Sequence, residues 1–281
     1  MDGGGVSGDV AHLAGRVAIV TGGGRGIGRA HAMRLARHGA AVLVNDLGTT
    51  VGGEGQDRSP AVSVVAEITT AGGSAVADEG DVSSFAGAAA IVERALAAFG
   101  RLDILVNNAG IATDAPIDDM TEELLLRHIG VHYVGTVGTC RAAVPHLRRQ
   151  GYGRIVNTVS EAALDTRFPG GVAYGGAKAA VWAATLAMSR QLLGTGVTVN
   201  AVSPGARTRM NEAMFAAAPP VLDLDPDHVA KVVAALVGED SGAINGHVIH
   251  AAAGSIRDYG VHRTAESPAV AWLTEAVDRL G

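Results

Sequence analysis

The chain has 281 residues, 48% of them hydrophobic, and a formal net charge of −6 at pH 7. This length and apolar content allow one large buried core, which favours a single domain. The negative charge and the lack of a basic run argue against a nucleic-acid partner. No apolar run reaches the roughly 20 residues of a membrane span. The single cysteine, Cys140, excludes an internal disulfide and a multi-cysteine metal site, and we expect no metal.

The termini differ in composition from the rest of the chain. Residues 1–12 are rich in glycine and lack a charged-then-apolar signal pattern, so we predict a flexible leader and a cytoplasmic protein. Residues 13–255 are predicted to form the catalytic domain, and residues 256–281 a C-terminal extension. Within this extension, Ser267 and Pro268 resemble an N-cap followed by proline, which predicts a terminal helix.

A glycine-rich turn follows the first predicted strand. The apolar run Val17–Val20 indicates a buried strand, and an apolar-periodic helix starts near Ile27. Three glycines lie between them, Gly22, Gly26 and Gly28. Because glycine has no Cβ, a pyrophosphate can approach the backbone N–H groups and the positive end of the helix closely. The turn therefore predicts a dinucleotide site, although an ordinary turn has the same composition.

The second predicted strand ends in an acidic residue. Asp46 lies eighteen residues beyond Gly28, near the spacing at which a carboxylate binds the adenosine ribose hydroxyls. Such a carboxylate repels a 2′-phosphate, which favours NAD over NADP. Arg25 in the glycine turn argues for NADP, and we give Asp46 more weight.

Predicted strands alternate with predicted helices along the rest of the chain. This alternation is typical of an α/β fold with a parallel sheet covered by helices on both faces, and ligands bind beyond the carboxyl ends of its strands. A long loop, Leu47–Pro60, and a long helix, Thr121–Arg149, are also expected. The remaining predicted strands are 41–44, 74–77, 102–106, 154–158, 198–202 and 247–251.

Three polar residues suggest proton-transfer chemistry. Tyr174 and Lys178 are four residues apart, so a helix places them on one face. A nearby ammonium should lower the pKa of the Tyr174 phenol towards neutrality, making it a usable acid or base. Lys178 can also hold the nicotinamide ribose. Ser160 follows a predicted strand and can polarise a carbonyl or orient an alcohol.

These residues resemble the short-chain dehydrogenase/reductase family across roughly residues 13–255. The resemblance implies a Rossmann-type, doubly wound parallel sheet of seven strands and a Ser-Tyr-Lys mechanism. It also implies an adenine contact at Asp81 and Val82 and a contact of Asn108 with the cofactor. The residues expected to bind cofactor are Gly22, Arg25, Gly26, Ile27, Gly28, Asp46, Asp81, Val82, Asn108, Ala109, Gly110, Tyr174, Lys178, Pro204 and Gly205.

A closer resemblance is to a subgroup, the 3-hydroxyacyl-CoA dehydrogenase domain of peroxisomal multifunctional enzyme type 2 and its stand-alone bacterial relatives. It rests on Asn45–Gly48, Val131–Gly135, Ala206–Met210 and His250–Arg263. The wider family usually has Asn in a proton relay where His132 stands, and the subgroup has His. The spacing from Ser160 to Tyr174 is fourteen against a usual thirteen, which we interpret as one extra residue in the following loop.

Three functions are compatible with the sequence. The first is an NAD-dependent oxidoreductase that interconverts a secondary alcohol and a ketone, with a 3-hydroxyacyl thioester as one candidate substrate. The second is an NADPH-dependent ketoreductase, supported by Arg25 alone. The third is a cofactor-binding protein without turnover, against which the intact Ser160, Tyr174 and Lys178 argue.

The sequence also suggests an assembly and a lid. The resemblance implies dimers through the two long helices, and we expect a homotetramer or homodimer. The second helix supports this, because it has more apolar surface than packing on one sheet face should need, over Val181, Trp182, Thr185, Leu186, Met188 and Ser189. Residues 209–224 carry Met210, Met214 and Phe215 and are predicted to cover an apolar substrate; a fixed surface segment is the alternative.

Overall fold

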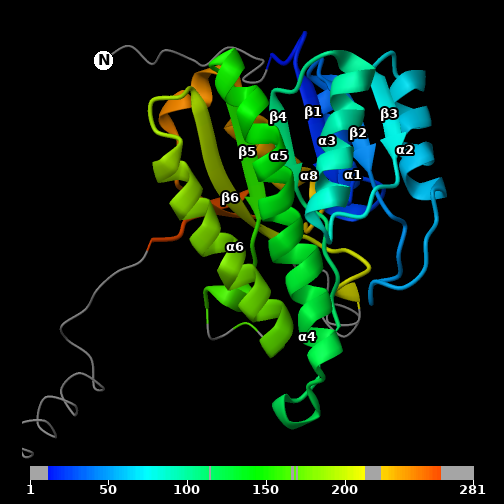
Figure 1. Cartoon of the computed structure of the whole chain (residues 1–281), viewed down its shortest axis with the longest axis vertical. Coiled ribbons are helices and arrows are strands. Elements are labelled where there is room, and N and C mark those ends of the chain that lie inside the picture. The colour runs from blue at the N-terminus through cyan, green and yellow to red at the C-terminus, as the bar shows by residue number, and fades with distance from the viewer. Residues whose placement is uncertain (1–11, 114, 166–167, 169, 213–222, 261–281) are drawn as a thin grey trace, which may run out of the picture.

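The computed structural model describes residues 12–113, 115–165, 168, 170–212 and 223–260. A central sheet has the strand order β3-β2-β1-β4-β5-β6-β7-β8 (Figure 1). The first seven strands are parallel, which confirms the predicted Rossmann-type sheet. The strands are β1 (Val17–Thr21), β2 (Ala41–Asn45), β3 (Ser74–Asp78), β4 (Ile104–Asn107), β5 (Gly153–Thr158), β6 (Val197–Gly205), β7 (Val248–Ala252) and β8 (Ser255–Asp258).

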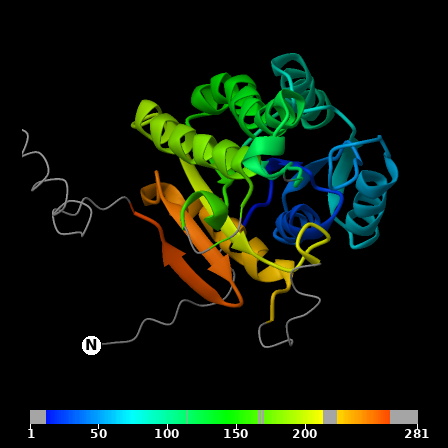
Figure 2. The same ribbon diagram turned by 90° about the horizontal axis from the view of Figure 1, so that it is seen from below.

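Helices cover both faces of the sheet (Figure 2). Helices α1 (Gly26–Arg37), α2 (Ser59–Thr70) and α8 (Pro226–Leu236) pack on one face. Helices α3 (Phe85–Phe99), α4 (Glu122–His128), α5 (Gly135–Gln150) and α6 (Val172–Gln191) pack on the other. The short helical turns η1 (Ile117–Asp119), η3 (Glu161–Ala163) and η4 (Glu239–Ala243) lie in loops.

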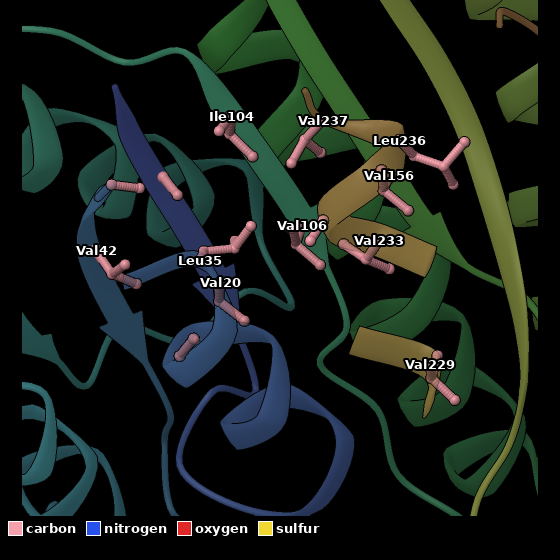
Figure 3. Packing of buried hydrophobic residues seen from close by; sticks show 14 of the residues in the cluster. Val20, Leu35, Val42, Ile104, Val106, Val156, Val229, Val233, Leu236 and Val237 are labelled. Atoms are coloured by element: carbon pink, nitrogen blue, oxygen red, sulfur yellow. The ribbon is translucent and has the colours of Figure 1, made fainter. Parts of the chain in front are cut away.

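Side-chain alternation along the strands builds two cores. On β1, Ala18 and Val20 join the core beneath α1 and α8, whereas Val17 and Ile19 join the core beneath α3 and α5. Figure 3 shows the first core, where side chains of α1 and α8 meet those of four neighbouring strands. Because both faces are buried, strands β1, β2 and β4 are apolar up to their last residue. The chain reverses direction across the sheet between β1 and β4, which is where ligands bind in such folds.

The predicted long helix is interrupted. Thr121 caps it as expected, since its Oγ1 accepts a hydrogen bond from the Leu124 N–H at 3.2 Å. A π-helical segment, η2 (Ile129–Val134), then separates α4 from α5. Such segments are rare and occur often at functional sites, and the periodicity of apolar residues does not distinguish them from an α-helix. His132 lies within this segment.

An eighth strand was missed by the sequence prediction of seven. Strand β8 pairs antiparallel with β7 through a two-residue turn, Ala253 and Gly254. Both turn residues have positive φ, 47° and 77°. Turns of this kind normally carry Asn or Asp followed by Gly. Because Ala253 stands at the first position, the sequence lacks the usual signal of a hairpin. Part of the predicted C-terminal extension therefore belongs to the sheet.

Several predictions fall outside the described residues. They are the leader apart from His12, the terminal helix of the extension, and most of the lid, including Met214 and Phe215. In the described part of the chain, no helix has the length and hydropathy that crossing a membrane requires.

Candidate active site

The glycine turn forms a cradle at the end of β1. Gly22 has a φ of +62°, which favours glycine. A Cβ on Gly28 would lie 2.0 Å from the Gly22 carbonyl oxygen, so only glycine fits there. Helix α1 begins at Gly26 without a side-chain cap and without an acidic residue in its first turn. Its first N–H groups are thus available to an anionic group such as a pyrophosphate, and the cradle fits the predicted dinucleotide.

A cavity of about 780 Å³ opens beside this cradle. It extends from the glycine turn to the carboxyl ends of β2 and β4 and to the segment that follows β6. Ten of the residues predicted to bind cofactor line it: Gly22, Arg25, Gly26, Ile27, Asp46, Asp81, Val82, Asn108, Ala109 and Gly110. Gly28, Pro204, Gly205, Tyr174 and Lys178 are not among its lining residues. Thr208 and Arg209, which no prediction assigned to the cofactor, line it as well.

The Asp46 carboxylate forms hydrogen bonds with the glycine turn before it and with the loop after it. Its Oδ2 accepts a hydrogen bond from the Gly24 N–H at 2.8 Å, and its Oδ1 accepts one from the Gly48 N–H at 2.7 Å. Each carboxylate oxygen can accept more than one hydrogen bond, so the group can also receive ribose hydroxyls. The carboxylate is thereby fixed where it lines the cavity.

Three arginines line the cavity, Arg25, Arg127 and Arg209, and each donates a hydrogen bond to the loop at residues 47–60. Arg25 Nη1 and Arg209 Nη2 donate to the Thr49 carbonyl at 3.3 and 3.1 Å. Arg25 also lies 3.7 Å from the carboxylate of Asp57. Burial and the neighbouring Arg25 lower the pKa of Arg209, while Asp46 opposes the shift. The long loop predicted at residues 47–60 is therefore held from two sides.

Asn108 has a structural contact that the resemblance did not suggest. Its Nδ2 donates to the carbonyls of Thr21 and Gly22, both at 3.1 Å. The Thr21 hydroxyl in turn accepts from the N–H groups of Asn108 and Ala109 at 3.0 and 3.1 Å. These hydrogen bonds join the end of β4 to the glycine turn, and Gly22, Asn108 and Ala109 line the cavity there.

Ser160, Tyr174 and Lys178 come together as predicted from their spacing. Ser160 follows β5, and its hydroxyl hydrogen-bonds the Tyr174 phenol on the first turn of α6. Lys178 lies one turn further along α6, with its Nζ 5.8 Å from the centre of the Tyr174 ring. The Lys178 Nζ donates to the Thr158 carbonyl at 2.8 Å, and the side chain is buried.

The pKa of Tyr174 differs from the prediction. Burial raises it above the ordinary value, and the hydrogen bond from Ser160 only partly opposes that increase. Burial also lowers the pKa of Lys178 to about 7. The predicted fall of the Tyr174 pKa towards neutrality is therefore wrong for the protein without ligands, because the same burial that brings the two groups together removes water from both.

His132 lies between the cavity and Tyr174. Its buried ring packs against Gly110, where a Cβ would lie 2.6 Å from Cε1, and stands edge-on to the Tyr174 ring at 5.3 Å. Nε2 lies 2.9 Å from the Ile111 carbonyl oxygen, and Nδ1 has no hydrogen-bond partner among the described residues. Burial, followed by the charge of Lys178, holds the His132 pKa well below its usual value. The ring is therefore neutral at pH 7.

A second histidine, His128, lies beside His132, and the sequence analysis did not assign it to the site. The two rings stack with centres 5.8 Å apart. Two histidines four residues apart on one helix face can bind a metal. The expectation of no metal did not take this spacing of His128 and His132 into account. In the structure, His128 Nδ1 and His132 Nε2 lie against backbone carbonyls, those of Leu124 and Ile111. Among the described residues, no three His, Cys, Asp or Glu side chains converge on a metal-sized site.

Comparison with known proteins agrees with this geometry. The short chain dehydrogenase family model matches residues 16–218. The chain is 40% identical over 251 residues to a hydroxyacyl-CoA dehydrogenase of Mycobacterium tuberculosis, covering 84% of this chain and 77% of the relative. It is 40% identical over 242 residues to the peroxisomal multifunctional enzyme type 2 of Drosophila melanogaster, covering 85% of this chain and 39% of that enzyme.

A solved structure shares the fold. The crystal structure of a short chain dehydrogenase from Mycobacterium avium matches 96% of this chain and 95% of its own, with a TM-score of 0.79 and 38% identity. The chain spans 25%, 26% and 39% of the length of three multifunctional peroxisomal relatives. From the family match, the shared fold and the Ser-Tyr-Lys geometry, the chain belongs to the short-chain dehydrogenase family of NAD(P)-using oxidoreductases.

Proposed function

We propose that this protein is an NAD-dependent dehydrogenase that interconverts a secondary alcohol and a ketone. The observation that carries the proposal is the hydrogen bond between Ser160 and Tyr174, with Lys178 one helical turn away. A non-catalytic cofactor-binding protein has no need of a buried phenol, hydroxyl and ammonium in this arrangement.

Each residue has a distinct role in the proposed reaction. The bound nicotinamide would accept or supply the hydride. Ser160 orients the substrate oxygen, and Tyr174 exchanges a proton with it. The raised pKa keeps the phenol protonated, ready to donate to a ketone oxygen. In alcohol oxidation Tyr174 must first lose that proton, and a charged Lys178 stabilises the resulting phenolate.

His132 is proposed to take part in proton movement. Its neutral ring lies beside Tyr174 and leaves Nδ1 without a partner in the described part of the chain. A neutral imidazole can accept a proton on one nitrogen and release one from the other. This suits a relay position at which the wider family usually has Asn.

NAD is the proposed cofactor because of Asp46. Its carboxylate lines the cavity and is fixed there by the Gly24 and Gly48 N–H groups. A 2′-phosphate close to this charge would be repelled. The alternative, an NADPH-dependent ketoreductase, is supported by Arg25 and Arg209 on the same cavity. Both of these arginines already donate to the Thr49 carbonyl, which favours the NAD assignment.

A 3-hydroxyacyl-CoA is the proposed substrate. The support comes from the names of similar proteins, a hydroxyacyl-CoA dehydrogenase and peroxisomal hydratase-dehydrogenase-epimerases. The corresponding reaction oxidises the 3-hydroxyl of the thioester to a 3-ketone while NAD is reduced.

A homotetramer or homodimer remains the proposed assembly. Of the α6 residues cited for it, Val181, Thr185 and Ser189 are buried within the chain itself. The apolar surface left for a partner is smaller than predicted, namely the partly exposed Trp182, Leu186 and Met188. The cytoplasmic location stays a prediction from the N-terminal sequence.

A cofactor-dependent activity screen tests this function. Purified protein is mixed with NAD or NADP and with 3-hydroxyacyl-CoA thioesters or simple secondary alcohols, and reduced cofactor is followed by its absorbance. We expect turnover with NAD and the thioesters. Faster turnover with NADP would support the ketoreductase. Cofactor binding by calorimetry without turnover in either direction would support the non-catalytic alternative.

A further inference from the structure

The side chain of Glu161, which follows Ser160 directly, binds the C-terminal end of the described chain. Its Oε1 accepts a hydrogen bond from the Tyr259 hydroxyl at 2.6 Å, a contact between residues 98 positions apart. The Glu161 side chain is only 13% exposed. The Glu161 carboxylate is therefore bound to Tyr259, whereas the hydroxyl of the preceding Ser160 is bonded to Tyr174.

His250 on β7 completes this cluster. Its ring stands edge-on to the Tyr259 ring with centres 6.1 Å apart. Its Nδ1 lies 3.4 Å from the Glu161 Oε1 and has no hydrogen-bond partner in the part of the chain that the structure describes. Tyr259 is also fixed through its backbone, because its N–H donates to the Val248 carbonyl at 2.8 Å. The cluster thus ties the η3 turn to the β7–β8 hairpin.

The contact has a fixed direction of donation. Burial, together with the hydrogen bond and charge of Glu161, raises the pKa of Tyr259 to about 12. Tyr259 is consequently a neutral donor at any pH at which the enzyme would work, and Glu161 the acceptor. A hydrogen bond to a charged group is stronger than one between neutral groups.

The η3 turn connects this contact to Ser160. The Ser160 hydroxyl accepts a hydrogen bond from the Ala162 N–H at 3.2 Å, and its carbonyl accepts from the Ala163 N–H at 3.0 Å. The Glu161 carbonyl accepts from the N–H groups of Leu164 and Asp165 at 2.9 and 2.8 Å. The turn is a small rigid unit that begins at Ser160, and the side chain of Glu161 attaches it to the hairpin.

We propose that Tyr259 is a positioning residue of the dehydrogenase, which acts through the Glu161 carboxylate to hold the Ser160 hydroxyl against Tyr174. The idea rests on the proposed function for its catalytic consequence. Its geometric consequence, the placement of Ser160, can be measured without any substrate. The C-terminal hairpin, which lies beyond the residues 16–218 that the family model matches, would thereby set the efficiency of proton transfer.

The experiment compares Tyr259→Phe with Tyr152→Phe. Each variant removes one tyrosine hydroxyl that donates a hydrogen bond, and the Tyr152 hydroxyl donates to the Val237 carbonyl, near the amino end of β5 rather than its catalytic end. We expect Tyr259→Phe to lower kcat about tenfold, the order of one lost hydrogen bond to a charged group, with the dissociation constant for NAD unchanged. Glu161→Gln, whose amide oxygen still accepts from Tyr259, should keep most of the activity, whereas Glu161→Ala should match Tyr259→Phe.

A spectroscopic measurement separates positioning from both stability and activity. The chain has four tyrosines, so ¹³Cζ labelling gives a simple NMR spectrum in which the Tyr174 signal reports its hydrogen bond to Ser160. We expect Tyr259→Phe to shift this signal in the same direction as Ser160→Ala, and the double variant to shift it no further than Ser160→Ala alone.

Three outcomes would overturn the proposal. One is an unchanged Tyr174 signal in Tyr259→Phe. Another is a fall in melting temperature with kcat retained, as a purely structural contact would give. The third is an equal loss of kcat in Tyr152→Phe. If the wild-type protein shows no turnover, the proposed function fails, and the NMR comparison still decides whether Tyr259 positions Ser160.

Discussion

The cofactor side and the catalytic side of this site use charge in opposite ways. Around the glycine turn, the Asp46 carboxylate accepts hydrogen bonds from backbone N–H groups, and Arg25 and Arg209 donate to a backbone carbonyl. Around Tyr174, the ionisable groups are buried. Burial raises the pKa of Tyr174 and lowers the pKa values of Lys178 and His132, so it favours the neutral form of each group. The cofactor side therefore presents fixed charges for recognition, whereas the catalytic side holds protons that can move.

This difference predicts which measurements respond to which changes. Substitutions on the cofactor side should alter affinity and the choice between NAD and NADP. Substitutions on the catalytic side should alter turnover and the pH dependence of activity or stability, because a buried group exchanges its proton with the solvent over a shifted pH range.

The largest effect is expected for Tyr174→Phe. The variant keeps the ring that packs edge-on against His132 and removes only the hydroxyl that Ser160 binds. We expect kcat to fall by about 100-fold or more, as for other losses of a general acid or base, with NAD affinity retained in calorimetry. Tyr133→Phe, at a tyrosine that is 36% exposed, serves as the control. Near-normal turnover of Tyr174→Phe would refute the proposed mechanism.

The second prediction concerns the pH dependence of stability. Lys178 has a folded-state pKa of about 7 against an ordinary 10.5. Between these values the unfolded chain binds a proton that the folded chain does not, so this group makes the free energy of unfolding rise with pH by up to about 1.4 kcal/mol per unit. Below pH 7 both states are protonated, and the destabilisation by Lys178 is largest there.

Lys178→Met should remove that slope. In urea unfolding, we expect the variant to gain stability relative to wild type near pH 7 and to lose this advantage progressively towards pH 10. Lys231→Met is the matched control, since Lys231 is 57% exposed and lies 3.6 Å from Asp227. Parallel pH profiles for wild type and Lys178→Met would show that Lys178 is charged in the folded protein and that its pKa is ordinary.

The same contrast explains what could be predicted from the sequence. The glycine turn and the Tyr174–Lys178 pair depend on backbone geometry over a few residues, so spacing along the chain is sufficient. The pairing of Glu161 with Tyr259 joins residues 98 positions apart, and no local pattern indicates it. The pKa of Tyr174 was predicted in the wrong direction because a sequence shows that a lysine is near, but not how much water both groups lose.

Backbone irregularities were missed for a related reason. The π-helical segment around His132 contains the same apolar periodicity as a continuous helix over the few residues involved. The β7–β8 hairpin turns at Ala253, whose positive φ an alanine rarely adopts. In both places tertiary contacts override the local preference of the residues, and these places adjoin the catalytic side: η2 carries His132, and the hairpin carries His250 beside Glu161.

The smallest effect is expected for Asp46→Ala, on the cofactor side. The substitution removes the carboxylate that would bind the ribose hydroxyls and repel a 2′-phosphate, so the preference for NAD over NADP should fall by about tenfold, with kcat little changed. The measurement is the ratio of dissociation constants for the two cofactors. Glu54→Ala, which removes another carboxylate lining the same cavity, should leave the ratio unaltered. Loss of the bonds to Gly24 and Gly48 should weaken the binding of both cofactors equally, which cancels in the ratio. If wild type binds NADP more tightly than NAD, or if Glu54→Ala shifts the ratio as much as Asp46→Ala, then Asp46 does not select the cofactor and the case for Arg25 and NADP becomes the stronger one.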